Sequence, residues 1–157
     1  MVKLSKSWLL GLLAAMVIAP SAYATDEPFL ASISIFSPIA ITETSALSFG
    51  SVASAGTTQS VVVAPGDAGA ASFNLSGQSN LAITASVVEP SLALVNGATT
   101  ITVNSFTFGG GLAANGTANL SAAGTLNAAN VGATAVVPAN PASGAYTGNL
   151  ILRVVYQ

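Results

Sequence analysis

The final fourteen residues of the chain, Gly144 to Gln157, show a two-residue period of large apolar side chains. Every second position near the end holds a large apolar side chain, and these are Leu150, Leu152, Val154 and Tyr156. In an extended chain all four lie on one face. The opposite row is apolar on both sides of one charge, Arg153, which is typical of a strand inside a sheet. We therefore predict an interior strand that runs to the carboxyl terminus and belongs to the core.

Short alternating segments recur along the rest of the chain, separated by Gly, Pro and Asn. The predicted strands are 29–36, 59–64, 71–76, 80–86, 91–95, 99–108, 125–131 and 133–137, with shorter apolar pairs at 39–41 and 47–49. Residues 77–79 and Asn96-Gly97 are predicted hairpin turns, and a change of phase near Asn104-Ser105 predicts a bulge. Eight or nine short strands predict an all-β, immunoglobulin-like sandwich, either complete or lacking one strand.

The first 24 residues have the pattern of a secretory signal peptide. Two lysines precede an apolar run from Trp8 to Ala19, and Ala22-Tyr23-Ala24 is a small-residue cleavage site. Removal of 24 residues from 157 leaves 133, enough for one domain. We expect cleavage after Ala24, an N-terminal extension at 25–38 and a sandwich domain at 39–157.

Charge is scarce after that cleavage. One cation, Arg153, stands against five carboxylates, which gives a net charge of −4. The absence of a basic patch argues against nucleic acid as a partner. Lysines normally protect exposed strand edges from joining other chains, and this sequence has almost none to do so. A protein whose copies join edge to edge would be expected to lack such lysines. A weakly charged surface protein could also lack them without joining other copies.

The side-chain inventory argues against an enzyme. The chain has no histidine and no cysteine, so Ser-His, Cys-His and zinc arrangements are excluded. The five carboxylates are scattered, and Glu43, Asp67 and Glu89 stand at turns or strand ends where a solvated charge is ordinary. We predict no catalytic residue, no metal site, no cofactor and no small-molecule substrate.

The C-terminal pattern resembles that of subunits of bacterial chaperone-usher pili. These subunits carry a penultimate aromatic residue, alternating hydrophobic residues before it and a glycine fourteenth from the end. The matching residues are Tyr156, then Val154, Leu152 and Leu150, and Gly144. The chain also resembles spore-coat-U-like pilins and an uncharacterised family of secreted bacterial proteins, in which Leu47-Ser48-Phe49-Gly50 recurs. The missing disulfide is a departure from many pilins.

The resemblance implies a mode of assembly. A periplasmic chaperone would hold the C-terminal strand, an outer-membrane usher would receive the subunit, and a donor strand from the next subunit would then pair with it. The candidate donor residues share one face of segment 29–36, and they are Phe29, Ala31, Ile33 and Ile35. A second interpretation stays open, in which this segment is the first strand of a self-complete sandwich.

Two functions follow as expectations. The first is a structural subunit of a fimbria-like fibre, exported through the periplasm to the cell surface and joined to other copies by donor-strand exchange. The second is a self-complete secreted or surface sandwich that acts as an adhesion or matrix-binding module through its loops. Few aromatic platforms remain for sugar stacking after cleavage, which favours the first.

Overall fold

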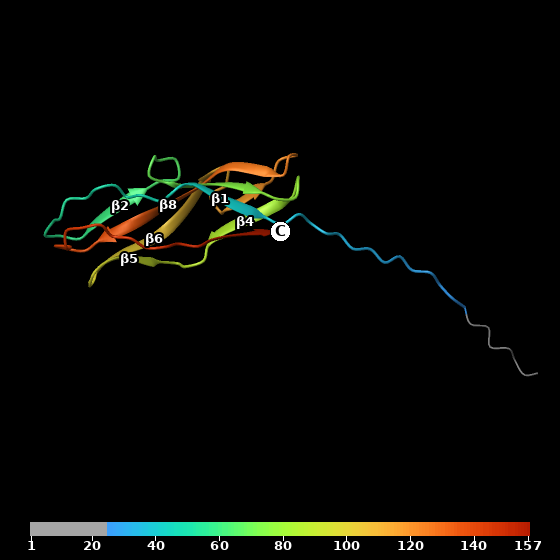
Figure 1. The fold of residues 1–157 in the computed structure, drawn as a ribbon, viewed down its shortest axis with the longest axis horizontal. Coiled ribbons are helices and arrows are strands. Elements are labelled where there is room, and N and C mark those ends of the chain that lie inside the picture. The colour runs from blue at the N-terminus through green and yellow to red at the C-terminus, as the bar shows by residue number, and fades with distance from the viewer. Residues whose placement is uncertain (1–24) are drawn as a thin grey trace, which may run out of the picture. The chain divides into compact units, whose positions relative to one another are not determined.

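The computed structural model describes residues 25–157. The expected signal peptide and its cleavage site at Ala24 lie outside the described residues. Residues 34–157 form a compact unit, and residues 25–33 belong to a separate one. All regular structure in the described part is β, in nine strands (Figure 1). No helix within residues 25–157 has the length and apolarity needed to cross a membrane.

The larger sheet is antiparallel, and β8 is its central strand. Its members are β1 (Ala40–Ser45), β2 (Gln59–Val63), β3 (Ala71–Ser76), β5 (Leu92–Asn96), β6 (Thr99–Gly110) and β8 (Thr125–Val137). The order is β1-β3-β8-β6-β5, and β2 also pairs with β8. The register of β1 against β3 shifts between Glu43 and Ser45.

The prediction of two strands at 125–131 and 133–137 is wrong, because β8 runs through both without a break. Its first part pairs with β3 and its second part with β2 on one side, while β6 lies along the other. Gly132 stays in the ladder opposite Thr107. The inward row, which includes Val131, Ala133 and Ala135, keeps its phase across the glycine and holds the strand together.

The smaller sheet has the order β7-β4-β9. These strands are β4 (Ala82–Val87), β7 (Thr117–Asn119) and β9 (Leu152–Tyr156). The predicted hairpin at 77–79 is wrong, because β3 and β4 belong to different sheets. Leu75 of β3 and Ile83 of β4 are both buried in the cluster between the sheets, so crossing from one sheet to the other buries both apolar rows.

The predicted hairpin between β5 and β6 is present with its loop displaced by one residue, and the predicted bulge in β6 is confirmed. β5 and β6 form a hairpin with Asn96 opposite Thr99, so the loop is Gly97-Ala98, one residue later than predicted. The register of β6 against β8 shifts between Asn104 and Thr107, where the bulge was predicted. The two antiparallel sheets confirm the predicted all-β sandwich (Figure 1).

The core consists of two clusters, which are covered by different parts of the chain. One cluster lies between the two sheets and contains Leu75, Ile83 and Leu120. The other lies on the larger sheet around Val103 and Ala135, and the side chains packed on it include Leu47, Phe49 and Tyr146. Those three residues come from irregular segments outside any strand, so this part of the larger sheet is covered by irregular chain in place of a strand.

Candidate assembly groove

The prediction that the C-terminal strand is interior is wrong for the single chain. Within residues 25–157, β9 has one ladder partner, β4, with Tyr156 opposite Ile83 and Leu152 opposite Val87. Ile151 and Val155, in the outer row, are 57% and 49% exposed. The apolar outer row indicated a strand with two neighbours, and the single chain supplies one.

The predicted inward face of β9 is confirmed. Its apolar side chains are half-buried, and Leu152, Val154 and Tyr156 pack on the cluster between the sheets. Leu150, also half-buried, lies just before the strand. The apolar face of the strand is therefore supported from one side by the domain's own core.

The segment before β9 crosses from one sheet to the other. Thr147 bridges Val95 of β5 through two backbone hydrogen bonds of 2.8 and 3.3 Å, and the ladder with β4 starts at Leu152. The C-terminal strand is therefore shorter than predicted, because it begins at Leu152 and the predicted apolar row begins at Leu150. Gly144 has a φ of +142°, and the Asn96 side chain occupies the place where a Cβ would lie. The positive φ and the close approach of Asn96 both require glycine at position 144, in the turn that precedes the bridge.

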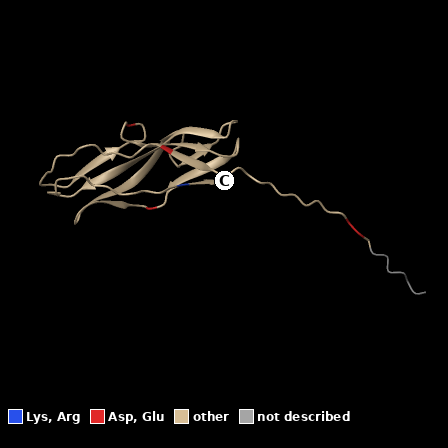
Figure 2. Cartoon of the chain, in the orientation of Figure 1, with Lys and Arg blue, Asp and Glu red and all other residues tan. Residues whose placement is uncertain are grey.

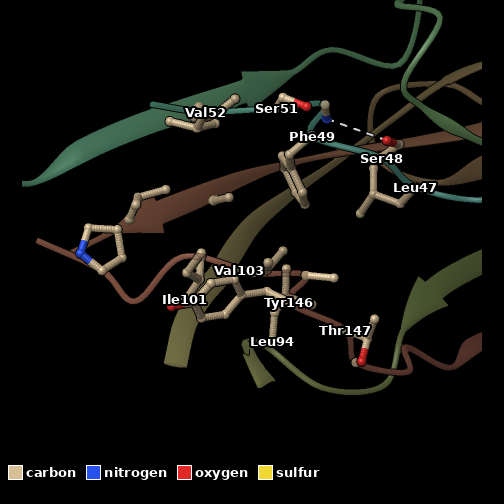
Figure 3. Close-up of a pocket in the computed structure, with 18 of the residues that line it drawn as sticks. Leu47, Ser48, Phe49, Ser51, Val52, Leu94, Ile101, Val103, Tyr146 and Thr147 are labelled. Atoms are coloured by element: carbon tan, nitrogen blue, oxygen red, sulfur yellow. Dashed lines mark hydrogen bonds between the residues drawn. The ribbon is translucent and has the colours of Figure 1, made fainter. Parts of the chain in front are cut away.

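A cavity of about 720 Å³ lies between the larger sheet and the irregular segments that cover it (Figure 3). All four of Leu47, Phe49, Val103 and Tyr146 line it, and Figure 3 shows Leu47 and Phe49 on one side with Val103 and Tyr146 on the other. A second hollow of about 260 Å³ shares Leu47, Gly148 and Leu150 with the first and extends to Leu152. We call these two hollows together, bounded by residues 43–52 and 141–152, the assembly groove.

The backbone of β9 presents unpaired groups at its free edge. The amide of Val88 donates to the carbonyl of Ile151, and the amide of Gln157 donates to that of Ala82, at 3.0 Å each. Odd-numbered residues thus direct their backbone groups toward β4. Because these directions alternate along a strand, the amides and carbonyls of Leu152 and Val154 point to the free edge. An incoming strand would find its hydrogen-bonding partners there.

Tyr156 anchors the chain at the carboxyl end of β9. Its hydroxyl accepts a hydrogen bond from the Gln78 amide at 2.6 Å and donates one to the Ser37 carbonyl at 2.7 Å. Its ring lies 5.9 Å from that of Phe36. A Cβ at position 77 would overlap the hydroxyl, so Gly77 permits this approach. The contacts hold residues 36 and 37 beside the end of β9, an arrangement that the sequence did not reveal.

The candidate donor segment carries unburied apolar side chains. Phe29, Ile33 and Ile35 are 89%, 86% and 87% exposed, and Ala31 is exposed as well. The predicted strand at 29–36 is absent. An extended segment becomes a strand only when a neighbour supplies ladder hydrogen bonds, and none of residues 25–157 supplies them to this segment.

Charged groups are sparse in the described part of the chain, as Figure 2 shows. Arg153 is the sole cation among residues 25–157 and lies exposed on the outer row of β9. Glu43 lines the smaller hollow of the groove. Among these residues no three His, Cys, Asp or Glu side chains gather as metal ligands would. Apart from Glu43, the side chains that line the groove are uncharged and mostly apolar, which suits the groove to apolar side chains.

Residues 39–156 match the family described as a domain of unknown function, DUF4402. The chain belongs to this family. No curated protein and no solved structure matches it. In this DUF4402 domain the matched residues begin just before β1 and end with β9, so they include both sides of the assembly groove. The exposed apolar segment 29–36 precedes them.

Proposed function

We propose that this DUF4402 protein is a structural subunit of a cell-surface fibre whose copies join by donor-strand exchange. Residues 29–36 of one copy would add as a strand to the free edge of β9 in the next, with their apolar row in the assembly groove. The observation that carries the proposal is the unpaired, apolar edge of β9 beside a groove that the chain leaves unfilled.

The outer row of β9 supports an additional neighbour. Ile151 and Val155 project from the outer face of β9 and remain about half exposed, and within residues 25–157 no strand lies beside them at the free edge. A donor strand would cover part of this surface and satisfy the backbone groups at the free edge. Each large apolar donor side chain that becomes buried would contribute about 1.5–3 kcal/mol before ordering costs.

The sparse charge also supports edge-to-edge joining. Natural edge strands usually carry lysines or other devices that prevent association. β9 carries one charge, Arg153, in the middle of its outer row, and the donor segment carries none between Phe29 and Phe36. No like-charge repulsion therefore opposes contact between these two surfaces.

An exported subunit with an open groove needs temporary cover. We extend the proposal to a periplasmic chaperone that fills the groove first and an outer-membrane usher that exchanges it for the donor segment. The exposed apolar surfaces of the groove and of the donor segment support the need for a chaperone. Such surfaces associate non-specifically when they are left uncovered. In this proposal the protein is exported through the periplasm and functions at the cell surface.

The experiment compares the protein purified from cells with two deletions. Strand exchange is slow because the whole ladder must open, so we expect an SDS-resistant ladder that boiling removes. Deletion of residues 25–36 is expected to yield monomer. Deletion of 25–28 alone keeps the apolar row and is expected to retain the ladder. A monomer in all three samples would refute the fibre and favour a self-complete adhesion or matrix-binding module.

A further inference from the structure

The donor segment and β9 have matching rows of side chains. The inward row of the donor is Phe29, Ala31, Ile33 and Ile35, and that of the acceptor is Leu150, Leu152, Val154 and Tyr156. Residues directly opposite one another in paired strands point to the same face. When the four inward residues of the donor lie opposite the four inward residues of the acceptor, Ser32 lies opposite Arg153. Each of these two residues is at the centre of its outer row.

Other registers are poorer. A shift by two residues brings either Glu27 or Ser37 into the inward row in place of an apolar residue. A shift by one residue turns the whole apolar row to solvent. With four opposite four, the Ser32 hydroxyl can accept a hydrogen bond from the Arg153 guanidinium. Leu30 then lies on the outer face beside one of the exposed apolar residues of β9, Ile151 or Val155.

The direction of insertion follows from where each chain leaves its own domain. Tyr156 holds Phe36 and Ser37 at the carboxyl end of β9. If the donor runs antiparallel to β9, its own domain lies at the Leu150 end of the acceptor. The acceptor's segment leaves from the other end, so copies can continue head to tail. Parallel insertion would put both connections at one end, where two copies can exchange segments and close as a pair.

Proline supports the antiparallel direction. In that register Pro28 lies opposite Gln157, whose amide donates to Ala82 of β4 and so points away from the donor. The position requires no donor amide, and proline has none. The residues that face the free-edge groups of β9 are the inward donor row, and each of these has an amide to donate.

Resting on the proposed function, we infer that a second copy inserts residues 29–35 antiparallel to residues 150–156, with Ser32 opposite Arg153 and Leu30 opposite Val155. Both outer pairs are non-hydrogen-bonded, because the odd residues of β9 direct their backbone groups to β4. The Cα atoms of such pairs lie about 4.5 Å apart, within the range that a disulfide spans.

The test uses engineered cysteines, which would be the sole thiols because the chain has none. Leu30→Cys with Val155→Cys is expected to give a ladder that survives boiling in SDS and disappears on reduction. Ser32→Cys with Arg153→Cys is expected to do the same. Leu30→Cys with Ile151→Cys, the parallel pairing, and each single variant are expected to give monomer after boiling.

Each result bears on one claim. A covalent product from the Ile151 pair in place of the Val155 pair would overturn the antiparallel direction. A normal unboiled ladder from the double variants, with no covalent product from the Val155 or Arg153 pair, would overturn the register and leave strand exchange standing. Absence of any ladder in the unsubstituted protein would overturn the proposed function, and the inference with it.

Discussion

Replacing two inward donor residues by serine separates assembly from folding. Ile33 and Ile35 are 86% and 87% exposed in the single chain, so Ile33→Ser with Ile35→Ser removes almost no contact from the domain. In the fibre each isoleucine would be buried, at about 1.5–3 kcal/mol. The pair should therefore weaken assembly by about 3–6 kcal/mol, which is roughly a hundredfold to ten-thousandfold in the association equilibrium.

The assay measures both quantities on the same preparations. Sedimentation velocity and unboiled SDS gels report the assembled fraction over a concentration series. Thermal unfolding followed by circular dichroism reports the stability of the domain, which should change by less than about 0.5 kcal/mol for an exposed position. Leu30→Ser is the matched control, because Leu30 is 94% exposed yet lies on the outer row of the segment. We expect it to weaken assembly less than the double substitution does.

Three results would each refute part of the reasoning. Unchanged assembly of the double variant would show that the inward row is not buried between copies. A loss of domain stability as large as that of a core substitution would show that these side chains pack within their own chain. Equal effects of the double variant and of Leu30→Ser would remove the distinction between the two rows of the segment.

Three further predictions concern the domain itself. Tyr156→Phe removes two hydrogen bonds and leaves an amide unpaired, so we expect a loss of about 1–3 kcal/mol in chemical unfolding, whereas Tyr146→Phe removes one exposed bond and should cost less. Ala135→Val adds volume beside the 720 Å³ cavity and should raise the midpoint of thermal unfolding by an amount equivalent to about 1 kcal/mol, while a lowered midpoint would show that this part of the cavity is closed. Leu75→Ala, at a side chain 1% exposed, should cost about 2–5 kcal/mol in urea unfolding, against a near-neutral Val62→Ala at 66% exposure; comparable losses would contradict the described core.

The local pattern of side chains predicted the bounds and the inward rows of individual strands well, because these features depend only on the residues of the strand itself. β3 was predicted with its observed bounds, 71–76, and the inward row of β9 was predicted residue by residue. The bulge after Asn104 followed from a change of phase within one strand. Such features depend on the two-residue period of extended chain and on turn residues nearby in sequence.

Pairings between distant segments were predicted poorly. The turn at 77–79 reads as a hairpin, yet it carries the chain from one sheet to the other. Gly132 reads as a break, yet β8 continues through it because β6 pairs along both parts. The groove went unpredicted as well, since its walls, near Leu47 and Tyr146, come from segments almost a hundred residues apart. Neighbours of this kind are chosen by the packing of the whole domain.

The sequence by itself determined that this protein is an all-β sandwich, which rows of its strands are apolar, and that its carboxyl-terminal pattern suits pairing on both sides. The tertiary structure alone decided that β9 has one neighbour, that a groove lies beside it, and that Tyr156 holds the root of the N-terminal segment at its end. The physical reason is that alternation reports which side chains require burial. Which surface buries them depends on contacts that form only when the chain has folded.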